Sequence, residues 1–194
     1  MLDMILLRDI CSFNTLISGF NQHGRPFEAL NFYERMQNEG VCSDAITFIC
    51  ILKICGSTRA IAKGKQIHNE IKNNKYHLEK DIALGNALVD MYANCGSMHH
   101  ARVMFDRMND VPKRDIVSWN SLIGGCALYE KGQEALRYLD KMQNERIRPD
   151  AITFVNILKS CRSRETLNAG KVVHFYIIEN NCHTDAFLWS SLID

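Results

Sequence analysis

The sequence contains the same thirteen-residue phrase twice. Residues 44–56 read DAITFICILKICG, and residues 150–162 read DAITFVNILKSCR. Nine of the thirteen positions are identical, and the two copies are 106 residues apart. A long internal repeat of this kind is typical of chains that fold as stacked copies of one supersecondary unit.

The 106-residue spacing extends well beyond this phrase. Further segments match at the same distance: Glu28-Ala29-Leu30 with Glu134-Ala135-Leu136, Met36 to Glu39 with Met142 to Glu145, and Gly64-Lys65 with Gly170-Lys171. The 194-residue chain therefore holds almost two copies of one long block.

Each block divides into pairs of amphipathic helices. Apolar residues recur at i, i+3, i+4 and i+7, which is the spacing of one helix face. In the second helix of each pair a small residue opens this stripe and lets two helices approach closely. The first helices include Phe13, Leu16, Ile17 and Phe20, and the second helices include Ala29, Phe32, Tyr33 and Met36. Gly24 and Gly96 lie between paired helices, where a tight turn favours glycine.

Five units of 34 to 37 residues result, followed by the start of a sixth. A helix pair of this size cannot bury its apolar stripe alone, so neighbouring pairs must stack. The sequence predicts a single all-α domain over residues 1–194, a solenoid of about five helix-turn-helix repeats with one long concave face. The predicted units are residues 10–44, 45–81, 82–115, 116–150, 151–185 and the partial unit 186–194.

Composition excludes several other classes of protein. The net charge is only +1, so any anion-binding face must be a local stripe rather than a property of the whole chain. No apolar run reaches the roughly 18 residues needed to span a bilayer, so no membrane partner is expected. Most of the eight cysteines fall in apolar helical stretches without a C-x-x-C pair, which indicates reduced core thiols.

These units resemble the pentatricopeptide repeats of the plant-type P–L–S subclass. Units 10–44 and 116–150 are similar to P units, and AITFICILKICG…GKQIH and AITFVNILKSCR…GKVVH are similar to L units. GNALVDMYANCGSMHHARVMFDRM is similar to an S unit. The resemblance covers essentially the whole chain and implies a right-handed superhelix. Two departures are Glu130 and Arg146, which stand where the first P-like unit has Gly24 and Gly40.

The resemblance also implies a fragment of a longer protein. Residues 1–9 resemble the tail of a preceding S unit, and the chain carries no E or DYW domain of the kind that ends many such proteins. Members of this subclass work in mitochondria or chloroplasts, and a mitochondrial location is expected first, although no transit peptide is visible in the chain.

The family's mode of binding implies which residues would read RNA. One base-reading residue lies early in the first helix of a unit, and a second closes the unit. Carried over, these are Asn14 with Asp44, Asn86 with Asp115, and Asn120 with Asp150. An Asn/Asp pair favours uridine, with cytidine second, and the Asn amide offers both a donor and an acceptor to a base edge. The positions expected to sandwich bases are Cys11, Ile46, Ala83, Val117 and Ile152.

The two L-like units carry apolar residues at the base-reading position. They pair Ile49 with Asp81 and Val155 with Asp185, so little base selectivity is expected there. The predicted partner is single-stranded RNA with the footprint 5′-U-N-U-U-N-3′. Lys53 and Lys159 recur at equivalent places and are candidates for phosphate contacts, although a recurring lysine is more often a solvated residue of a helix face.

No catalytic, metal or cofactor site is expected. His68-Asn69-Glu70 fits the H-x-E half of a zinc deaminase, but the P-C-x-x-C half is absent. The chain is therefore expected to supply sequence selectivity for C-to-U editing, with a deaminase or another editing protein as partner and no small-molecule substrate. The alternative is a protein-binding scaffold similar to tetratricopeptide solenoids, whose units are uniform rather than of three kinds.

Overall fold

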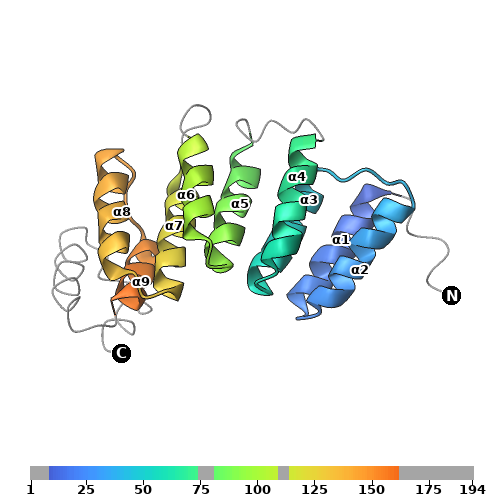
Figure 1. Ribbon diagram of the computed structural model, residues 1–194, viewed down its shortest axis with the longest axis horizontal. Helices are drawn as coiled ribbons and strands as arrows, with labels where there is room; N and C mark the ends of the chain where they lie inside the picture. Colours follow the sequence, from blue (N-terminus) through green and yellow to red (C-terminus); the bar gives the residue numbers. More distant parts are fainter. Residues whose placement is uncertain (1–8, 74–80, 109–113, 162–194) are drawn as a thin grey trace.

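The computed structural model describes residues 9–73, 81–108 and 114–161, and within these ranges it consists of nine α-helices with no strand. The helices stand side by side, with α1 and α2 at one end of the row and α8 and α9 at the other (Figure 1). Their bounds are α1 Ile10–Gln22, α2 Pro26–Asn38, α3 Ala45–Ser57, α4 Ile61–Asn73, α5 Ile82–Asn94, α6 Met98–Arg107, α7 Ile116–Leu128, α8 Gly132–Asn144 and α9 Ala151–Ser160.

An aspartate caps every first helix, by which we mean α1, α3, α5, α7 and α9. At α3 the Asp44 carboxylate accepts a hydrogen bond from the Thr47 backbone N–H, and the Thr47 hydroxyl accepts one from the Asp44 backbone. Such a reciprocal cap satisfies backbone donors that the helix itself leaves unpaired, and it stabilises a helix start by about 1 kcal/mol. The capping residues are Asp9, Asp44, Asp81, Asp115 and Asp150.

The helices form two layers that differ in how closely they pack. Successive first helices pack directly on one another, α1 on α3, α3 on α5, α5 on α7 and α7 on α9, whereas the backbones of successive second helices stay further apart. The first helices therefore form one continuously packed layer, which we call the inner layer, and α2, α4, α6 and α8 form the layer that we call the outer one.

The core lies between these layers. Four first helices place a fully buried aromatic side chain at their fourth position, and the small residues that open the stripes of the second helices, such as Ala29 and Ala135, are buried as well. Burying a side chain of this size stabilises the fold by about 1.5–3 kcal/mol. The aromatic residues are Phe13, Phe48, Trp119 and Phe154.

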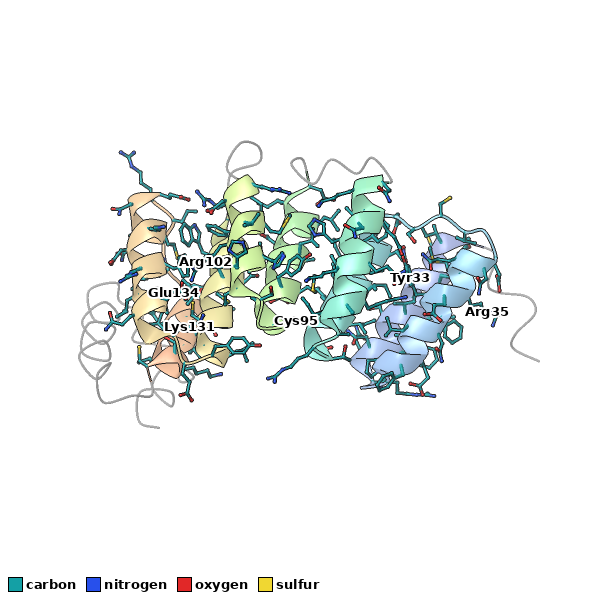
Figure 2. The ribbon with its side chains drawn as sticks, in the orientation of Figure 1. Tyr33, Arg35, Cys95, Arg102, Lys131 and Glu134 are labelled. Carbon is teal, nitrogen blue, oxygen red and sulfur yellow. The ribbon has the colours of Figure 1, made fainter. Side chains whose placement is uncertain are left out.

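Polar side chains connect the second helices. Arg102 of α6 forms an ion pair with Glu134 of α8 (Figure 2). Towards the other end of the same layer, Lys63 of α4 lies 3.3 Å from Glu34 of α2, and the Tyr33 hydroxyl of α2 donates to Glu70 of α4 at 2.7 Å. Opposite charges or a donor and an acceptor therefore face each other at these two junctions.

The predicted all-α solenoid is confirmed. The first helices begin at the first residues of the predicted units, while the assignment of those units to three types remains a prediction. Residues 162–185 of the fifth unit and the partial unit 186–194 lie outside the described residues. No helix in the described part of the chain is long and apolar enough to cross a membrane.

The cysteines are less uniformly buried than predicted. Cys55 and Cys126 are buried, and burial raises the pKa of each thiol to about 11. Cys11 and Cys42 are exposed, so the expectation of a core thiol is wrong for these two. Cys11 lies at the outward second position of α1, and Cys42 lies in the connection between α2 and α3. All the cysteines that the structure describes are free thiols.

Glu130 is held in a strained backbone conformation. Its φ is 52°, in the left-handed region that disfavours side chains, and the equivalent turn of the first unit uses Gly24 with φ 70°. Glu130→Gly should therefore raise the free energy of unfolding by about 0.5–1 kcal/mol, measured by urea denaturation. Gly24→Ala is the reciprocal control and should lower it, because a Cβ there meets no neighbour and only backbone strain is added. If Glu130→Gly and Gly24→Ala changed the free energy of unfolding by the same amount in the same direction, this account would be contradicted.

Candidate functional site

The second residue of every first helix points away from the core. Ile46, Val117 and Ile152 are 59%, 52% and 59% exposed, and they are three of the six large apolar side chains exposed among the described residues. Cys11 and Ala83 occupy the same position in α1 and α5 and are also exposed. All five predicted base-sandwiching positions thus lie at the N-terminal ends of the inner helices, with apolar surface open to solvent.

In α1, α5 and α7 the fifth residue is an asparagine that lies beside the aspartate capping the next first helix. Asn14 Nδ2 donates to Asp44 Oδ1 at 3.1 Å. The same bond joins Asn86 to Asp115 at 3.2 Å and Asn120 to Asp150 at 3.1 Å. The structure therefore brings together each of the three Asn/Asp pairs named from the sequence, the first helix of a unit meeting the residue that closes it.

A hydroxyl residue completes each pair and was missed from the sequence. The Thr47 hydroxyl donates to Asn14 Oδ1 at 2.7 Å, the Ser118 hydroxyl to Asn86 Oδ1 at 2.6 Å, and the Thr153 hydroxyl to Asn120 Oδ1 at 2.7 Å. Each Asn amide is thus held from both ends, and a 180° flip would place its oxygen against a carboxylate. We call each set of asparagine, aspartate and serine or threonine an amide clamp.

The clamp leaves part of each amide free to bind. A side-chain amide has two N–H donors and two acceptor lone pairs. The aspartate uses one donor and the hydroxyl occupies one lone pair, so one donor and one acceptor remain. Asn14 and Asn86 are only 9% and 7% exposed, whereas Asn120 is half-buried. A ligand that used these groups would have to approach the helix surface closely, with Asn120 the most accessible.

The aspartates have two roles in this arrangement. Each accepts from the asparagine of one unit and caps the first helix of the next. Burial opposes the charge of Asp44, but hydrogen bonds from the Thr47 backbone N–H and from Asn14 lower the pKa of Asp44 below its usual value. Asp44 is therefore a carboxylate at neutral pH and accepts hydrogen bonds only.

The L-like units lack the clamp. Ile49 is at the fifth position of α3, and the third position of α5, where the other units have a hydroxyl, is Leu84. Asp81 caps α5 through Ala83 and Leu84 only. Val155 at the fifth position of α9 is buried, while Asp185 lies outside the described residues.

The three hydroxyl residues of the clamps do have a signal in the sequence that could have identified them. Units with asparagine are followed by D-x-x-T or D-x-x-S, at Asp44, Asp115 and Asp150. Units with Ile49 or Val155 are followed instead by D-x-x-L, at Asp81 and Asp185. The third residue after the aspartate therefore varies in polarity together with the fifth residue of the preceding helix, which the fold explains by direct contact in the three clamps.

The candidate phosphate contacts lie on the inner helices. Lys53 in α3 and Lys159 in α9 are exposed. The pKa of Asp90 in α5 is raised above its usual value. Burial raises it more than the hydrogen bond with Asn94 and the charge of Lys53 lower it.

The H-x-E residues do not form a site. His68 faces α5, where its Nδ1 lies 2.8 Å from the Tyr92 hydroxyl, whereas Glu70 accepts from Tyr33 of α2 on the other side of α4. Residues two apart on a helix point in different directions. Among the described residues, no group of three or more histidine, cysteine or acidic side chains could hold a metal ion.

Comparisons with known proteins agree with this architecture. A family model described as PPR repeat family matches residues 8–57 and 114–163, and a model of the PPR repeat matches residues 86–110. The pentatricopeptide repeat-containing protein At3g56550 of Arabidopsis thaliana is 36% identical over 181 residues, covering 93% of this chain and 30% of the relative. The chloroplastic At1g15510 protein of the same plant is 35% identical over 188 residues, covering 95% and 21%.

Solved structures share the fold. The pentatricopeptide repeat protein PPR10, in complex with an 18-nt psaJ RNA element, superposes with a TM-score of 0.72 over 95% of this chain and 25% of that chain, at 17% identity. The RNase P protein PRORP2 of Arabidopsis thaliana superposes with a TM-score of 0.60 over 89% and 38%, at 13% identity. The chain spans less than a third of the length of the two curated relatives. The matched repeats cover more than half of the sequence, and the chain belongs to the pentatricopeptide repeat family.

Proposed function

We propose that this chain is a sequence-selective module for single-stranded RNA, built from P–L–S repeats. The observation that carries the proposal is the threefold recurrence of the amide clamp, each time beside an exposed second-position side chain of an inner helix. A helical repeat that presents one such set per unit can read one base per unit.

The geometry suggests how a base would be recognised. The base lies between the second-position side chains of neighbouring units, where a stacking contact contributes about 1–3 kcal/mol. Its Watson–Crick edge then meets the free donor and acceptor of the clamped amide. Because the amide is already oriented, binding does not have to order it, and a base that fails to match leaves a polar group unpaired.

The comparisons support RNA as the ligand class. PPR10, which shares the fold, was solved with an 18-nt RNA element. Relatives that match nearly the whole chain are named as mitochondrial and as chloroplastic proteins of Arabidopsis thaliana. We propose a role in organelle RNA processing, with C-to-U editing as the process and a deaminase, attached or recruited, as the catalyst. The P–L–S order of the units supports editing.

The proposal is tested by competition between short RNAs at fixed salt, because salt alone changes such affinities strongly. We expect 5′-U-N-U-U-N-3′ to outcompete the same RNA with purines at the three U positions. Asn120→Ala should weaken binding of the matched RNA by about 1–3 kcal/mol, and it should reduce discrimination only at the fourth base. The measurement is fluorescence anisotropy with RNAs that vary one base at a time.

Two variants separate this reading from a structural one. Thr153→Val removes the hydroxyl that orients Asn120 and should also relax selectivity at the fourth base, while Asn120 itself remains. Asn144→Ala changes an exposed asparagine at the end of α8 and should alter neither affinity nor selectivity. If Asn120→Ala and Thr153→Val leave base preference unchanged in a chain that binds RNA, the clamps serve packing only and the proposal fails.

A further inference from the structure

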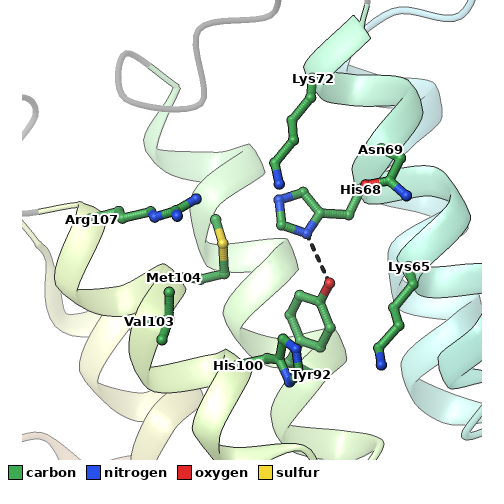
Figure 3. A pocket seen from close by; sticks show the side chains of 9 residues that line it. All are labelled: Lys65, His68, Asn69, Lys72, Tyr92, His100, Val103, Met104 and Arg107. Carbon is green, nitrogen blue, oxygen red and sulfur yellow. Dashed lines mark hydrogen bonds between the residues drawn. The ribbon is translucent and has the colours of Figure 1, made fainter.

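A cavity of about 290 Å³ opens between two outer helices, away from the amide clamps. It lies at the junction of α4 and α6, and Tyr92 of α5 forms part of its wall (Figure 3). Val103 and Met104 of α6 supply an apolar side. Its volume is at the lower end of the range of ligand pockets, which suits a small ligand.

The described residues around this cavity carry charges of one sign. Lys65 and Lys72 line it from α4, and Arg107 lines it from α6; no acidic side chain is among the described residues that line it. In Figure 3 the ends of Lys72 and Arg107 both point towards His68. None of these three cations forms an ion pair with another residue of the described ranges.

This junction differs from its two neighbours. Glu34 faces Lys63 between α2 and α4, and Arg102 pairs with Glu134 between α6 and α8. Between α4 and α6, like charges face each other across a cavity. Like charges in one partly desolvated site repel, and a bound anion would turn this repulsion into attraction.

A buried histidine provides a second, independent observation. His68 is 7% exposed, its Nδ1 is hydrogen-bonded with the Tyr92 hydroxyl at 2.8 Å, and its buried Nε2 has no hydrogen-bond partner in the part of the chain that the structure describes. Nε2 lies on the side of the ring towards Lys72 (Figure 3). Buried polar atoms are nearly always hydrogen-bonded, so an unpaired ring nitrogen in a cavity wall is a group to which a ligand in that cavity can bind.

We infer that the α4–α6 cavity is a binding site for a phosphate-type oxyanion, held by Lys65, Lys72 and Arg107 with His68 Nε2 as an additional donor. When the Tyr92 hydroxyl donates to Nδ1, the proton of the neutral imidazole is on Nε2 and points to the anion. The guanidinium of Arg107 offers paired donors to two oxygens, and the lysines neutralise the remaining charge. The chemistry fits a free phosphate ion or the phosphate group of a small monoester.

Calorimetric titration of the full 194-residue chain at neutral pH and constant ionic strength tests the site. One arm uses inorganic phosphate, a second uses ribose 5-phosphate, and chloride is the reference anion. We expect saturable binding of one phosphate-type ligand per chain. The ligand that binds more tightly shows whether the site prefers a free phosphate ion or the phosphate group of a monoester. The Lys72→Gln/Arg107→Gln double variant should weaken binding by about tenfold or more.

A matched control removes the same charges elsewhere. Arg137→Gln/Lys141→Gln changes one arginine and one lysine that are exposed on α8, and it should leave phosphate affinity unchanged. Burial, followed by the charges of Lys72, Arg107 and His100, lowers the pKa of His68 to about 4, so saturation with phosphate should raise that pKa in NMR titrations. Absence of saturable binding in both arms, or an equal loss of affinity in both double variants, would overturn the inference.

Discussion

Trp119→Ala should lower the free energy of unfolding by about 3–5 kcal/mol, the range found when a buried aromatic residue is truncated. The side chain is fully buried in α7 and joins three helices. Its ring meets Phe105 of α6 edge-on at 4.6 Å between centroids and Tyr138 of α8 at 6.4 Å, and the Arg114 guanidinium lies over it at 5.5 Å. An alanine would leave a cavity where two units meet.

Trp119→Phe is the matched control, because Phe13, Phe48 and Phe154 occupy the same position in other first helices. It should cost much less than Trp119→Ala, since it keeps the edge-on ring contact and removes the buried indole N–H, for which the described residues offer no hydrogen-bond partner. The measurement is chemical denaturation followed by circular dichroism. Because repeat proteins can unfold in parts, the comparison also needs hydrogen exchange in α6 to α8. Equal losses from the two changes would refute the packing argument.

Acidification from neutral pH to about pH 4 should remove roughly 3 kcal/mol of stability through His68 alone. Burial first, and then the charges of Lys72, Arg107 and His100, lowers the pKa of His68 from 6.5 to about 4. Between these two values the unfolded chain binds a proton that the folded chain excludes. Stability therefore rises with pH across this window, is fully present above about pH 6.5, and declines as the pH falls towards 4.

Denaturation curves at neutral pH and at about pH 5 measure this effect, without phosphate in the buffer. His68→Gln does not titrate and can still bond the Tyr92 hydroxyl, so its stability should depend less on pH by about 2 kcal/mol over this interval. His23→Gln changes an exposed histidine between α1 and α2 and should keep the pH dependence of the parent chain. A parent chain whose stability is flat between pH 5 and 7 would show that His68 titrates normally.

The amide clamps show how far a pattern in the sequence could go. The resemblance to the repeat family named the Asn/Asp pairs and the second positions. Repeat register then placed them alike in every unit, because each unit puts the same position at the same edge of the inner layer. The role of Thr47, Ser118 and Thr153 did not follow, since a hydroxyl at the third position of a helix is explained equally well by local capping. Only the packing of one first helix on the next shows that each hydroxyl also contacts the asparagine of the preceding unit.

The repeated apolar spacing by itself determined the helical pairs, their stacking and the all-α solenoid, because a helix stripe of that period has to be buried against a neighbour. The contacts between units were decided by the tertiary structure. Residues some 30 positions apart meet in the clamps, and His68 meets cations from both α4 and α6. The physical reason is that local periodicity states which face of a helix is buried, whereas the charge and hydrogen-bonding partners opposite that face come from another helix and depend on how the two are aligned.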